Sequence, residues 1–463
     1  MSLLVGGTAV SQALTVLAAP LLTRLYTPDD FGLLGGFASL VATLGAFLTL
    51  RYSLAIPLPK SDDDAAHVAV LSLLIAGTIV IAITVLLGTF GAEALRALNF
   101  DALVPHMWLL PVALTFVALN DVFTYWAIRL SAFGVVTRTT VARGIAGLTT
   151  QLAGAPLGAQ GLLLGNVAGA VAGSFTLASA GLRSQRGARL RQPIIGEVRR
   201  LASRYRRFPL FSAPAGLFNT LGVQLPPLLF VSLFSPTAAG QYVLAHRVLS
   251  LPMGLLGKAL ADVFLSRAAE ARRTDSLGPL VTAIHSALAR TAMPAAIGLM
   301  LIGPPLFGVV FGPDWEVAGQ LARWMAPWIY LVFVTSPLSS LFTVLEKQVQ
   351  GAAFQATLLI ARTAAILIGS QTGEIVHTVV LFSGASALCW LGFLAWVFRA
   401  AGQGGASFVA PTLRAGAVSA AMLLPLALVV ILQPQGVLAS VGTASSAVAV
   451  LYYYVRLVRE VLG

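Results

Sequence analysis

Charge is scarce in this chain of 463 residues. Asp, Glu, Lys and Arg together make up 10% of it, and hydrophobic residues make up 57%. Because soluble globular proteins carry about 25% charged residues, this shortage excludes an ordinary soluble domain and indicates a membrane protein with many spans. The few charges are also unbalanced, with a formal net charge of +12. Their positions must decide whether this reflects a nucleic-acid partner or a membrane.

Cysteine and clustered metal ligands are scarce as well. The single cysteine, Cys389, lies in an apolar run, which excludes an intramolecular disulfide and gives no indication of thiol chemistry. The five histidines are scattered, so we expect no metal site. The acidic run at 62–64 resembles a metal-binding cluster, but no nucleotide-binding domain surrounds it, and we interpret it as a solvated loop. Because no Walker A sequence is present, we expect no ATP hydrolysis and no cofactor.

Long apolar runs are abundant instead. About fourteen segments are long enough to cross a bilayer, and their continuous hydrophobicity predicts helices, since a spanning segment must satisfy its own backbone hydrogen bonds. No loop between them is long enough to house a catalytic domain. The predicted spans lie near residues 3–22, 31–56, 66–89, 105–128, 134–153, 160–182, 209–232, 239–262, 279–302, 318–342, 351–370, 376–398, 413–432 and 436–454.

Lysine and arginine are unevenly distributed among the loops. If the N-terminus is cytoplasmic, the cytoplasmic loops and the C-terminal tail hold 21 of the 29 basic residues, and the opposite loops hold only Arg24 and Arg96. Because basic residues accumulate on the cytoplasmic side of membrane proteins, this distribution predicts that both termini are cytoplasmic. It also explains the high net charge, so no nucleic-acid partner is expected.

The turn near the head of the chain recurs 208 positions later. The residues LYTP at 25–28, followed by Gly32, correspond to LFSP at 233–236, followed by Gly240. An even number of spans separates the two copies, which predicts parallel repeats related by an axis along the membrane normal.

This repeat predicts an all-α polytopic membrane protein with two parallel six-helix lobes around a central cavity and two appended helices. The predicted divisions are an N-lobe with spans 1–6, a C-lobe with a linker helix and spans 7–12, and the appended spans 13 and 14, at residues 1–192, 193–400 and 401–463.

An arginine-rich segment joins the two predicted lobes. Apolar side chains recur in it at helical spacing while arginines fill the other positions. This pattern predicts an amphipathic linker helix on the anionic cytoplasmic leaflet, whereas a plain basic loop would explain the charge but not the apolar stripe. The apolar positions are Ile194, Val198, Leu201, Tyr205 and Phe208.

Arginines outnumber acids inside the predicted spans. A charge at the centre of a spanning helix costs roughly 2.5–3.5 kcal/mol, so such residues are functional candidates. An excess of guanidinium groups suits an anionic substrate, because guanidinium pairs with phosphate through two parallel hydrogen bonds. Snorkelling of the side chain to the lipid headgroups is the alternative for each of them. The six arginines are Arg51, Arg143, Arg247, Arg290, Arg323 and Arg362.

Arg51 and Arg247 are the strongest candidates for substrate binding, because each lies on the second helix of a repeat hairpin. Asp121 is the one acid near the middle of a span, and it either couples transport to a proton or ion or pairs with a neighbouring arginine. Polar residues on the first helices of the lobes either bind the cargo or hydrogen-bond between helices. The remaining predicted cavity residues are Arg143, Arg290, Arg362, Gln12 and Asn219.

Several stretches of the sequence resemble the Wzx-type oligosaccharide flippases of the multidrug/oligosaccharidyl-lipid/polysaccharide (MOP) exporter superfamily. The resemblance runs from residue 3 to about residue 345, whereas the last hundred residues match only in hydropathy and number of spans. The stretches that carry it include PLLTRLYTPDDFG, LRYSLAIPLPKSDDDA, NDVFTYWAIR, RYRRFPLFSAPAGLFNTLGVQLP, YVLAHRVLSLPMGLLGKALADVFLSRAAE and FGPDWEVAG.

This resemblance implies two lobes, alternating access and a cationic cavity in a bacterial inner membrane. The implied cargo is an oligosaccharide linked to undecaprenyl pyrophosphate, which moves from the cytoplasmic to the periplasmic leaflet for surface polysaccharide synthesis, such as lipopolysaccharide O-antigen or exopolysaccharide. A polysaccharide polymerase and a chain-length regulator are candidate partners. Related lipid II flippases line their cavity with arginines from helices 1, 2 and 8, and Arg51 and Arg247 match the last two, whereas Arg24 matches less well.

Three alternatives to a flippase are open. A cation-coupled multidrug exporter of the same superfamily needs acidic residues in its cavity, and the excess of arginine argues against it. A membrane enzyme such as a glycan polymerase or ligase needs a sizeable periplasmic loop, which the sequence lacks. A non-transporting scaffold of a polysaccharide assembly complex would tolerate neutralisation of the intramembrane arginines.

Overall fold

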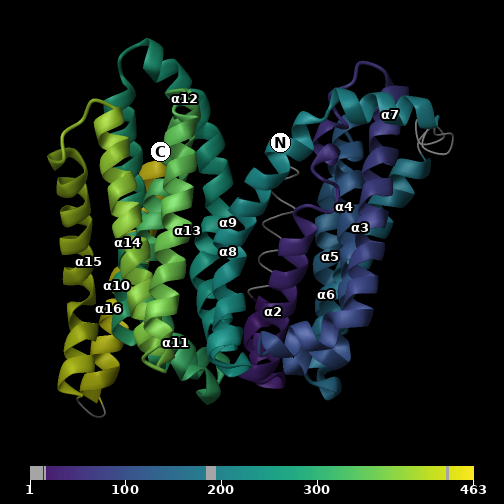
Figure 1. Ribbon diagram of the computed structural model, residues 1–463. Coiled ribbons are helices and arrows are strands. Elements are labelled where there is room, and N and C mark those ends of the chain that lie inside the picture. The colour runs from purple at the N-terminus through teal and green to yellow at the C-terminus, as the bar shows by residue number, and fades with distance from the viewer. Residues whose placement is uncertain (1–13, 15–16, 184–193, 434–436, 463) are drawn as a thin grey trace. The chain divides into compact units, whose positions relative to one another are not determined.

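The computed structural model describes residues 14, 17–183, 194–433 and 437–462, and the regular elements in these ranges are all helical (Figure 1). Nine of the described helices are long and apolar enough to cross a membrane by length and composition. The prediction of an all-α polytopic membrane protein is therefore confirmed. Contacts within the chain divide it into two compact units, Met1–Leu244 and Ala245–Gly463.

The helices of the first unit overlap the predicted spans, with one break, which lies in the predicted span 31–56. A helix at 17–25 precedes α2, and short helical turns (η1, η2, η3 and the π-helical η5) join the longer elements. The helices are α2 (Pro28–Gly45), α3 (Asp62–Ala97), α4 (Leu109–Arg129), α5 (Phe133–Ala153), α6 (Ala159–Arg183), α7 (Ile195–Arg204), α8 (Ala213–Leu233) and the start of α9 (Pro236–Arg273), with turns η1 (Tyr52–Ala55), η2 (Asp101–His106), η3 (Ala155–Leu157) and η5 (Phe208–Ser212).

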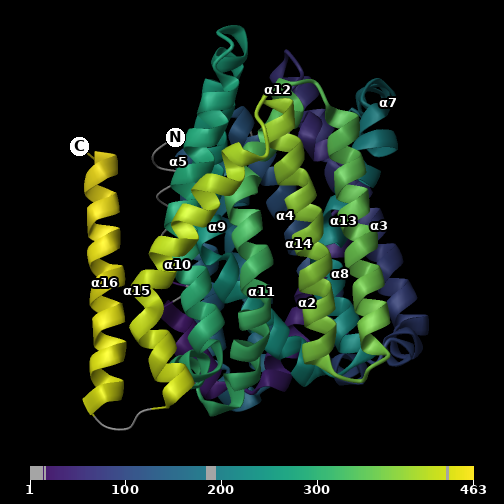
Figure 2. The ribbon, with the colours of Figure 1, turned by 90° about the vertical axis from the view of Figure 1, so that its left-hand side faces the viewer.

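The second unit contains the rest of α9 and the helices that follow it. Contacts run in the order α13, α14, α11, α10, α15 and α16, and Figure 2 shows α16 alongside α15. The helices are α10 (Leu277–Phe311), α11 (Glu316–Thr335), α12 (Leu341–Val344), α13 (Gln348–Ser370), α14 (Ile375–Ala400), α15 (Ala406–Leu432) and α16 (Val437–Leu462), with turns η6 (Pro313–Trp315) and η7 (Ser336–Ser340).

One predicted span, 31–56, is not a continuous helix. α2 ends at Gly45, and Leu50 and Arg51 adopt left-handed backbone angles, with φ of 45° and 62°. Each such residue costs roughly 1–3 kcal/mol and persists only where the surroundings hold it. The Tyr52 hydroxyl provides one such restraint, because it donates a hydrogen bond of 2.9 Å to the carbonyl of Ala202. Hydrophobicity extends across the break, so the sequence pattern gave no sign of it.

The two copies of the repeated turn contact each other within the first unit. A Cβ added at Gly32 would lie 1.8 Å from the carbonyl oxygen of Pro236, and one added at Gly240 would lie 1.9 Å from that of Pro28. These four residues are related by the 208-residue shift of the sequence repeat. The contact is therefore reciprocal, as in a two-fold interface, and it requires glycine at both crossing points.

A helix, α7, lies at the predicted linker position, and the middle of its apolar stripe packs on protein. Val198 and Leu201 are 9% and 0% exposed, and they belong to clusters that include Tyr52 and residues of α3. Ile195, outside this stripe, is 84% exposed. α3 and η1 therefore cover Val198 and Leu201, whereas Ile194 at the start of the stripe is 61% exposed, and contact of the helix with the bilayer stays a prediction. The linker residues 184–193 lie outside the described ranges.

Polar contacts fix α7 to the start of α3. Arg200 forms ion pairs with Asp64 at 2.7 Å and with Glu197 at 2.6 Å, and the backbone N–H of Ile194 donates to His67 Nε2 at 3.1 Å. The hydrogen bond to Glu197 is the main reason why the pKa of Arg200 lies above its ordinary value. These contacts hold the linker helix in one register against α3.

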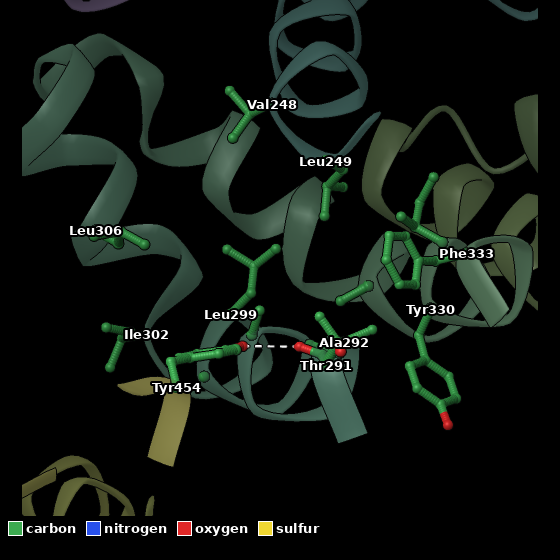
Figure 3. Close-up of a pocket in the computed structure, with 15 residues that line it drawn as sticks. Val248, Leu249, Thr291, Ala292, Leu299, Ile302, Leu306, Tyr330, Phe333 and Tyr454 are labelled. Atoms are coloured by element: carbon green, nitrogen blue, oxygen red, sulfur yellow. Dashed lines mark hydrogen bonds between the residues drawn. The ribbon is translucent and has the colours of Figure 1, made fainter. Parts of the chain in front are cut away.

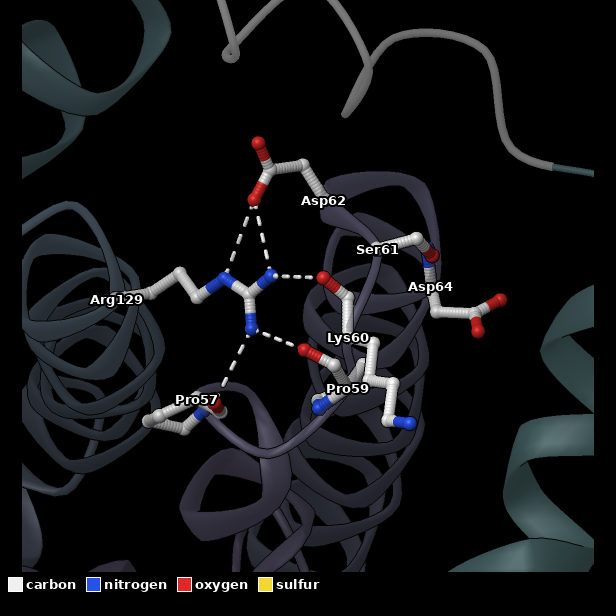
Figure 4. Close-up of polar contacts among 7 residues, drawn as sticks. All are labelled: Pro57, Pro59, Lys60, Ser61, Asp62, Asp64 and Arg129. Atoms are coloured by element: carbon white, nitrogen blue, oxygen red, sulfur yellow. Dashed lines mark hydrogen bonds and ion pairs between the residues drawn. The ribbon is translucent and has the colours of Figure 1, made fainter.

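The acidic run at 62–64 is structural and does not form a solvated loop. Asp62 forms an ion pair of 3.0 Å with Arg129 of α4 (Figure 4). The guanidinium of Arg129 also donates hydrogen bonds to the carbonyls of Pro57, Pro59 and Lys60. All three residues of the run lie in the first turn of α3, where negative charge favours the helix N-terminus. The fork of Arg129 thus fastens the segment after η1 to α4.

We expect Gly32→Ala to destabilise the protein. Its new methyl group would meet a helical backbone carbonyl, which cannot rotate away as a side chain can, so the cost is about 1–3 kcal/mol or more. Thermal unfolding of the purified protein in detergent measures this cost. Gly88→Ala in α3 is the control, because no atom lies within 4 Å of its Cβ position. Equal melting temperatures for the two variants would contradict the close contact.

Candidate functional site

Arg323 on α11 is part of the helical framework. Its guanidinium donates to the carbonyls of Met300 and Leu301 on α10. A helical carbonyl normally accepts from the N–H four residues later, and those positions are Pro304 and Pro305, which have no N–H. Arg323 therefore replaces two missing donors of α10.

Arg362 on α13 is held by aromatic rings. Its guanidinium carbon lies 4.9 Å from the ring centroid of Trp328 and 5.5 Å from that of Phe382, and its Nε donates to Ser386 Oγ at 3.0 Å. Cation–π contacts of this kind stabilise a cation away from water. Trp328 also stacks on His246 at 6.1 Å. Arg362 thus has protein partners on several sides.

Arg290 on α10 is exposed, and its Nη2 donates to Ser286 Oγ at 3.3 Å. Its backbone carbonyl lies four residues before Pro294 and so lacks a helical donor. The hydroxyl of Tyr453 on α16 supplies that donor at 3.2 Å. The backbone of Arg290 therefore has a structural role, while its side chain has one weak contact along its own helix.

Arg143 and Arg247 have no ion-pair partner among the described residues. Arg143 on α5 is exposed, and its aliphatic portion lies beside Gly169 and Gly173 of α6. Arg247 on α9 is half-buried. Their guanidinium groups keep their hydrogen-bonding capacity for another molecule.

Arg51 lies at the break after α2, and its guanidinium packs against α8. A Cβ added at Gly216 would lie 2.3 Å from Arg51 Nη2 and 2.6 Å from its Nε. The Nε is buried and has no hydrogen-bond partner. The position combines a strained backbone with an unsatisfied donor, which is typical of a functional residue.

Asp121 on α4 lies near Arg51, within range of its electrostatic attraction. Its carboxylate accepts a hydrogen bond of 3.2 Å from Thr49 Oγ1, which is itself 3.1 Å from Ser53 Oγ. The structure thus brings Arg51 and Asp121 into one polar cluster, but the described ion pairs do not include one between them. Pairing and coupling both stay predictions for Asp121.

The other predicted polar residues are placed less informatively. Asn219 is exposed on α8, three residues after Gly216 and therefore on the same helix face. Gln12 lies outside the described residues. Thr49, Ser53 and Gly216 were missed by the sequence reasoning. The spacing of Thr49 and Ser53 around Arg51 was the available signal for the first two, whereas Gly216 had none.

Apolar side chains of the second unit surround a cavity of about 520 Å³ (Figure 3). Val248 comes from α9, Ile302 from α10 and Phe333 from α11. Tyr454 of α16 closes one side, and its hydroxyl donates to the carbonyl of Thr291 at 2.9 Å. No charged residue is among the described residues that line this cavity, and this lining does not suit a phosphate group.

The chain has the fold of known membrane transporters. It matches "Lipid II flippase MurJ, inward closed conformation" with a TM-score of 0.78 and 11% identity over 100% of both chains. A multidrug resistance MATE family transporter of the MOP superfamily gives 0.66 and 14%, over 84% of this chain and 94% of that one. A Vibrio cholerae MATE transporter mutant gives 0.51 and 14%, over 88% and 96%. No curated protein matches the chain.

The fold is therefore that of a multi-pass, all-helical membrane protein and is shared with these solved transporters. Residues 21–320 match the family described as "Polysaccharide biosynthesis protein" (Polysacc_synt_3), which is more than half of the sequence. The chain belongs to this polysaccharide biosynthesis family.

Substitution of Arg323, which supports the helical framework, should change the stability of the protein differently from substitution of Arg247, which does not. We expect Arg323→Leu to lower the free energy of unfolding by about 1–3 kcal/mol, because two helical carbonyls inside the membrane lose their donor. Arg247→Leu should leave it equal or higher, because an unpaired charge is removed from an apolar region. Melting temperatures of the two purified variants, measured side by side, check this. A larger loss in Arg247→Leu would refute the sorting.

Proposed function

We propose that this protein is a Wzx-type flippase that moves an oligosaccharide linked to undecaprenyl pyrophosphate across a bacterial inner membrane. The cargo would pass from the cytoplasmic to the periplasmic leaflet by alternating access, with residues 1–192 and 193–400 acting as the two lobes. Membership of a polysaccharide biosynthesis family supports the class of cargo. The observation that carries the proposal is the set of intramembrane arginines without an ion-pair partner among the described residues.

A pyrophosphate group cannot cross about 30 Å of hydrocarbon unaided, because leaving water costs a charged group far more than thermal energy supplies. Guanidinium groups can replace that water with charge-assisted hydrogen bonds. The prenyl tail has no such barrier and can stay in lipid. Because nothing is covalently made or broken, the protein would act without catalysis.

Arg51, Arg143 and Arg247 are the primary candidates to bind the pyrophosphate, since their guanidinium groups have no ion-pair partner in the described part of the chain. Arg290 and Arg362 would contribute secondarily, because each also contacts its own helix or an aromatic pair. The predicted roles for the polar residues are unchanged: Asn219 and Gln12 would contact the cargo, and Asp121 would serve in coupling.

A cation-coupled drug exporter is the main rival, because MATE transporters share the fold. Such a transporter needs an accessible acid for a cationic drug. Asp121 is the acid in the cluster around Arg51, and it receives a hydrogen bond from Thr49 beside a cation. This arrangement favours an anionic cargo over a cationic one.

Complementation of glycan export tests the proposal. Cells lacking the native gene would receive wild type, Arg51→Ala, Arg247→Ala or the double variant at matched expression. We expect each single variant to reduce surface polysaccharide about tenfold, which corresponds to the loss of roughly one charge-assisted hydrogen bond. Lipid-linked precursor should accumulate at the same time. Arg96→Ala is the control, because Arg96 is exposed at the end of α3 and outside the proposed site.

The readouts separate the alternatives. Normal export from the double variant would refute the assignment of these arginines and favour a scaffold. An absence of precursor in the deletion strain would point to an enzyme earlier in the pathway. Export that is intact while resistance to a cationic dye falls would favour the drug exporter.

A further inference from the structure

Gly216 on α8 differs from the other described glycines, because the atoms nearest to its Cβ position belong to the guanidinium group of an arginine. The position that its Cβ would take lies 2.3 Å from Nη2, 2.6 Å from Nε and 2.7 Å from the guanidinium carbon of Arg51. Real Cβ contacts do not occur at such distances, so the guanidinium occupies the volume that any side chain at position 216 would fill. The Arg51 guanidinium can lie there only because residue 216 has no side chain.

The chain around Arg51 is built to hold this placement. Leu50 and Arg51 both adopt positive φ, five and six residues after α2 ends at Gly45. Tyr52, directly after it, is buried and hydrogen-bonded to Ala202 of α7. The residue after Arg51 thus holds the strained backbone in place. Such strain at the cost of local stability indicates that the position of Arg51 is important for function.

The Arg51 guanidinium is not fully satisfied where it lies. Its Nε is buried without a hydrogen-bond partner, and the described ion pairs include none with Asp121, although the two charges attract each other. A guanidinium group in a water-poor region with open donor positions binds oxygen anions strongly, and phosphate matches its geometry best. The placement on Gly216 therefore matters for a phosphate-bearing ligand.

We propose that Gly216 is a positioning residue for anion binding: the absence of its side chain creates the space in which the Arg51 guanidinium is held ready for the pyrophosphate of the cargo. This inference rests on the proposed flippase function and adds a residue of α8 to its site. Gly222 shows that glycine on α8 does not always have this role, because nothing lies within 4 Å of its Cβ position.

Substitution at Gly216 should separate stability from binding. The atoms that an alanine methyl would meet are the far end of a flexible side chain, so the Arg51 guanidinium can move aside at little cost. Alanine also favours a helix more than glycine does. We therefore expect Gly216→Ala to fold normally but to hold Arg51 in the wrong place.

The experiment measures binding of geranylgeranyl pyrophosphate to purified protein in nanodiscs, with geranylgeraniol as the uncharged reference. Wild type should prefer the pyrophosphate. Gly216→Ala should bind it about tenfold more weakly, equivalent to 1.4 kcal/mol, while Gly222→Ala binds as wild type does. In an Arg51→Ala background, Gly216→Ala should cause no further loss, because the group that it displaces is gone. Melting temperatures of both glycine variants should equal or exceed that of wild type.

Equal affinities of Gly216→Ala and Gly222→Ala would overturn the inference, as would an equal loss from Gly216→Ala with and without Arg51. If Gly216→Ala melts lower than wild type, the double variant with Arg51→Ala decides. Recovery of the melting temperature supports the contact with Arg51, and no recovery overturns it. A wild-type protein that binds the alcohol as well as the pyrophosphate would refute the proposed function itself.

Discussion

Inside a bilayer every backbone carbonyl needs a donor from the protein, because water is absent. Proline removes such donors, and α10 contains three prolines within its length. The carbonyl of Arg290 is satisfied by Tyr453 of α16, and those of Met300 and Leu301 by Arg323 of α11. This requirement binds three helices of the second unit together and assigns Arg323 to the framework, although its charge alone suggested a ligand site.

A similar requirement applies to the other intramembrane arginines, because a charged side chain inside the bilayer also needs a partner. Arg362 is surrounded by aromatic rings and Ser386, whereas Arg51, Arg143 and Arg247 have no ion-pair partner in the described ranges. Placing a guanidinium inside a bilayer without an anion is unfavourable, so folding alone does not explain these residues. A cargo with phosphate oxygens would offset that cost during transport, and it would do so only while bound.

The helices could be predicted from the sequence because bilayer-length apolar runs allow few other structures, and α5, α6 and α13 begin and end within a few residues of the predicted spans. The break at Arg51 could not, since neither proline nor glycine occupies its two left-handed positions. Hydropathy also could not distinguish Arg323 from Arg247, because the difference depends on carbonyls of another helix. The apolar stripe of α7 was recognised, but periodicity does not say whether protein or lipid covers it.

Glycine links the two hairpins of the sequence repeat at both ends of α2. At its start, Gly32 lies against the carbonyl of Pro236 on α9, and beyond its end Arg51 lies against Gly216 on α8. α8 and the beginning of α9 form the second copy of the hairpin, so α2 and the segment after it rest on its repeat at two places. Because neither contact leaves space for a side chain, a displacement of α8 along α2 would move the surface that holds the Arg51 guanidinium. The contact between the two copies of the repeat would then also control the position of the Arg51 guanidinium.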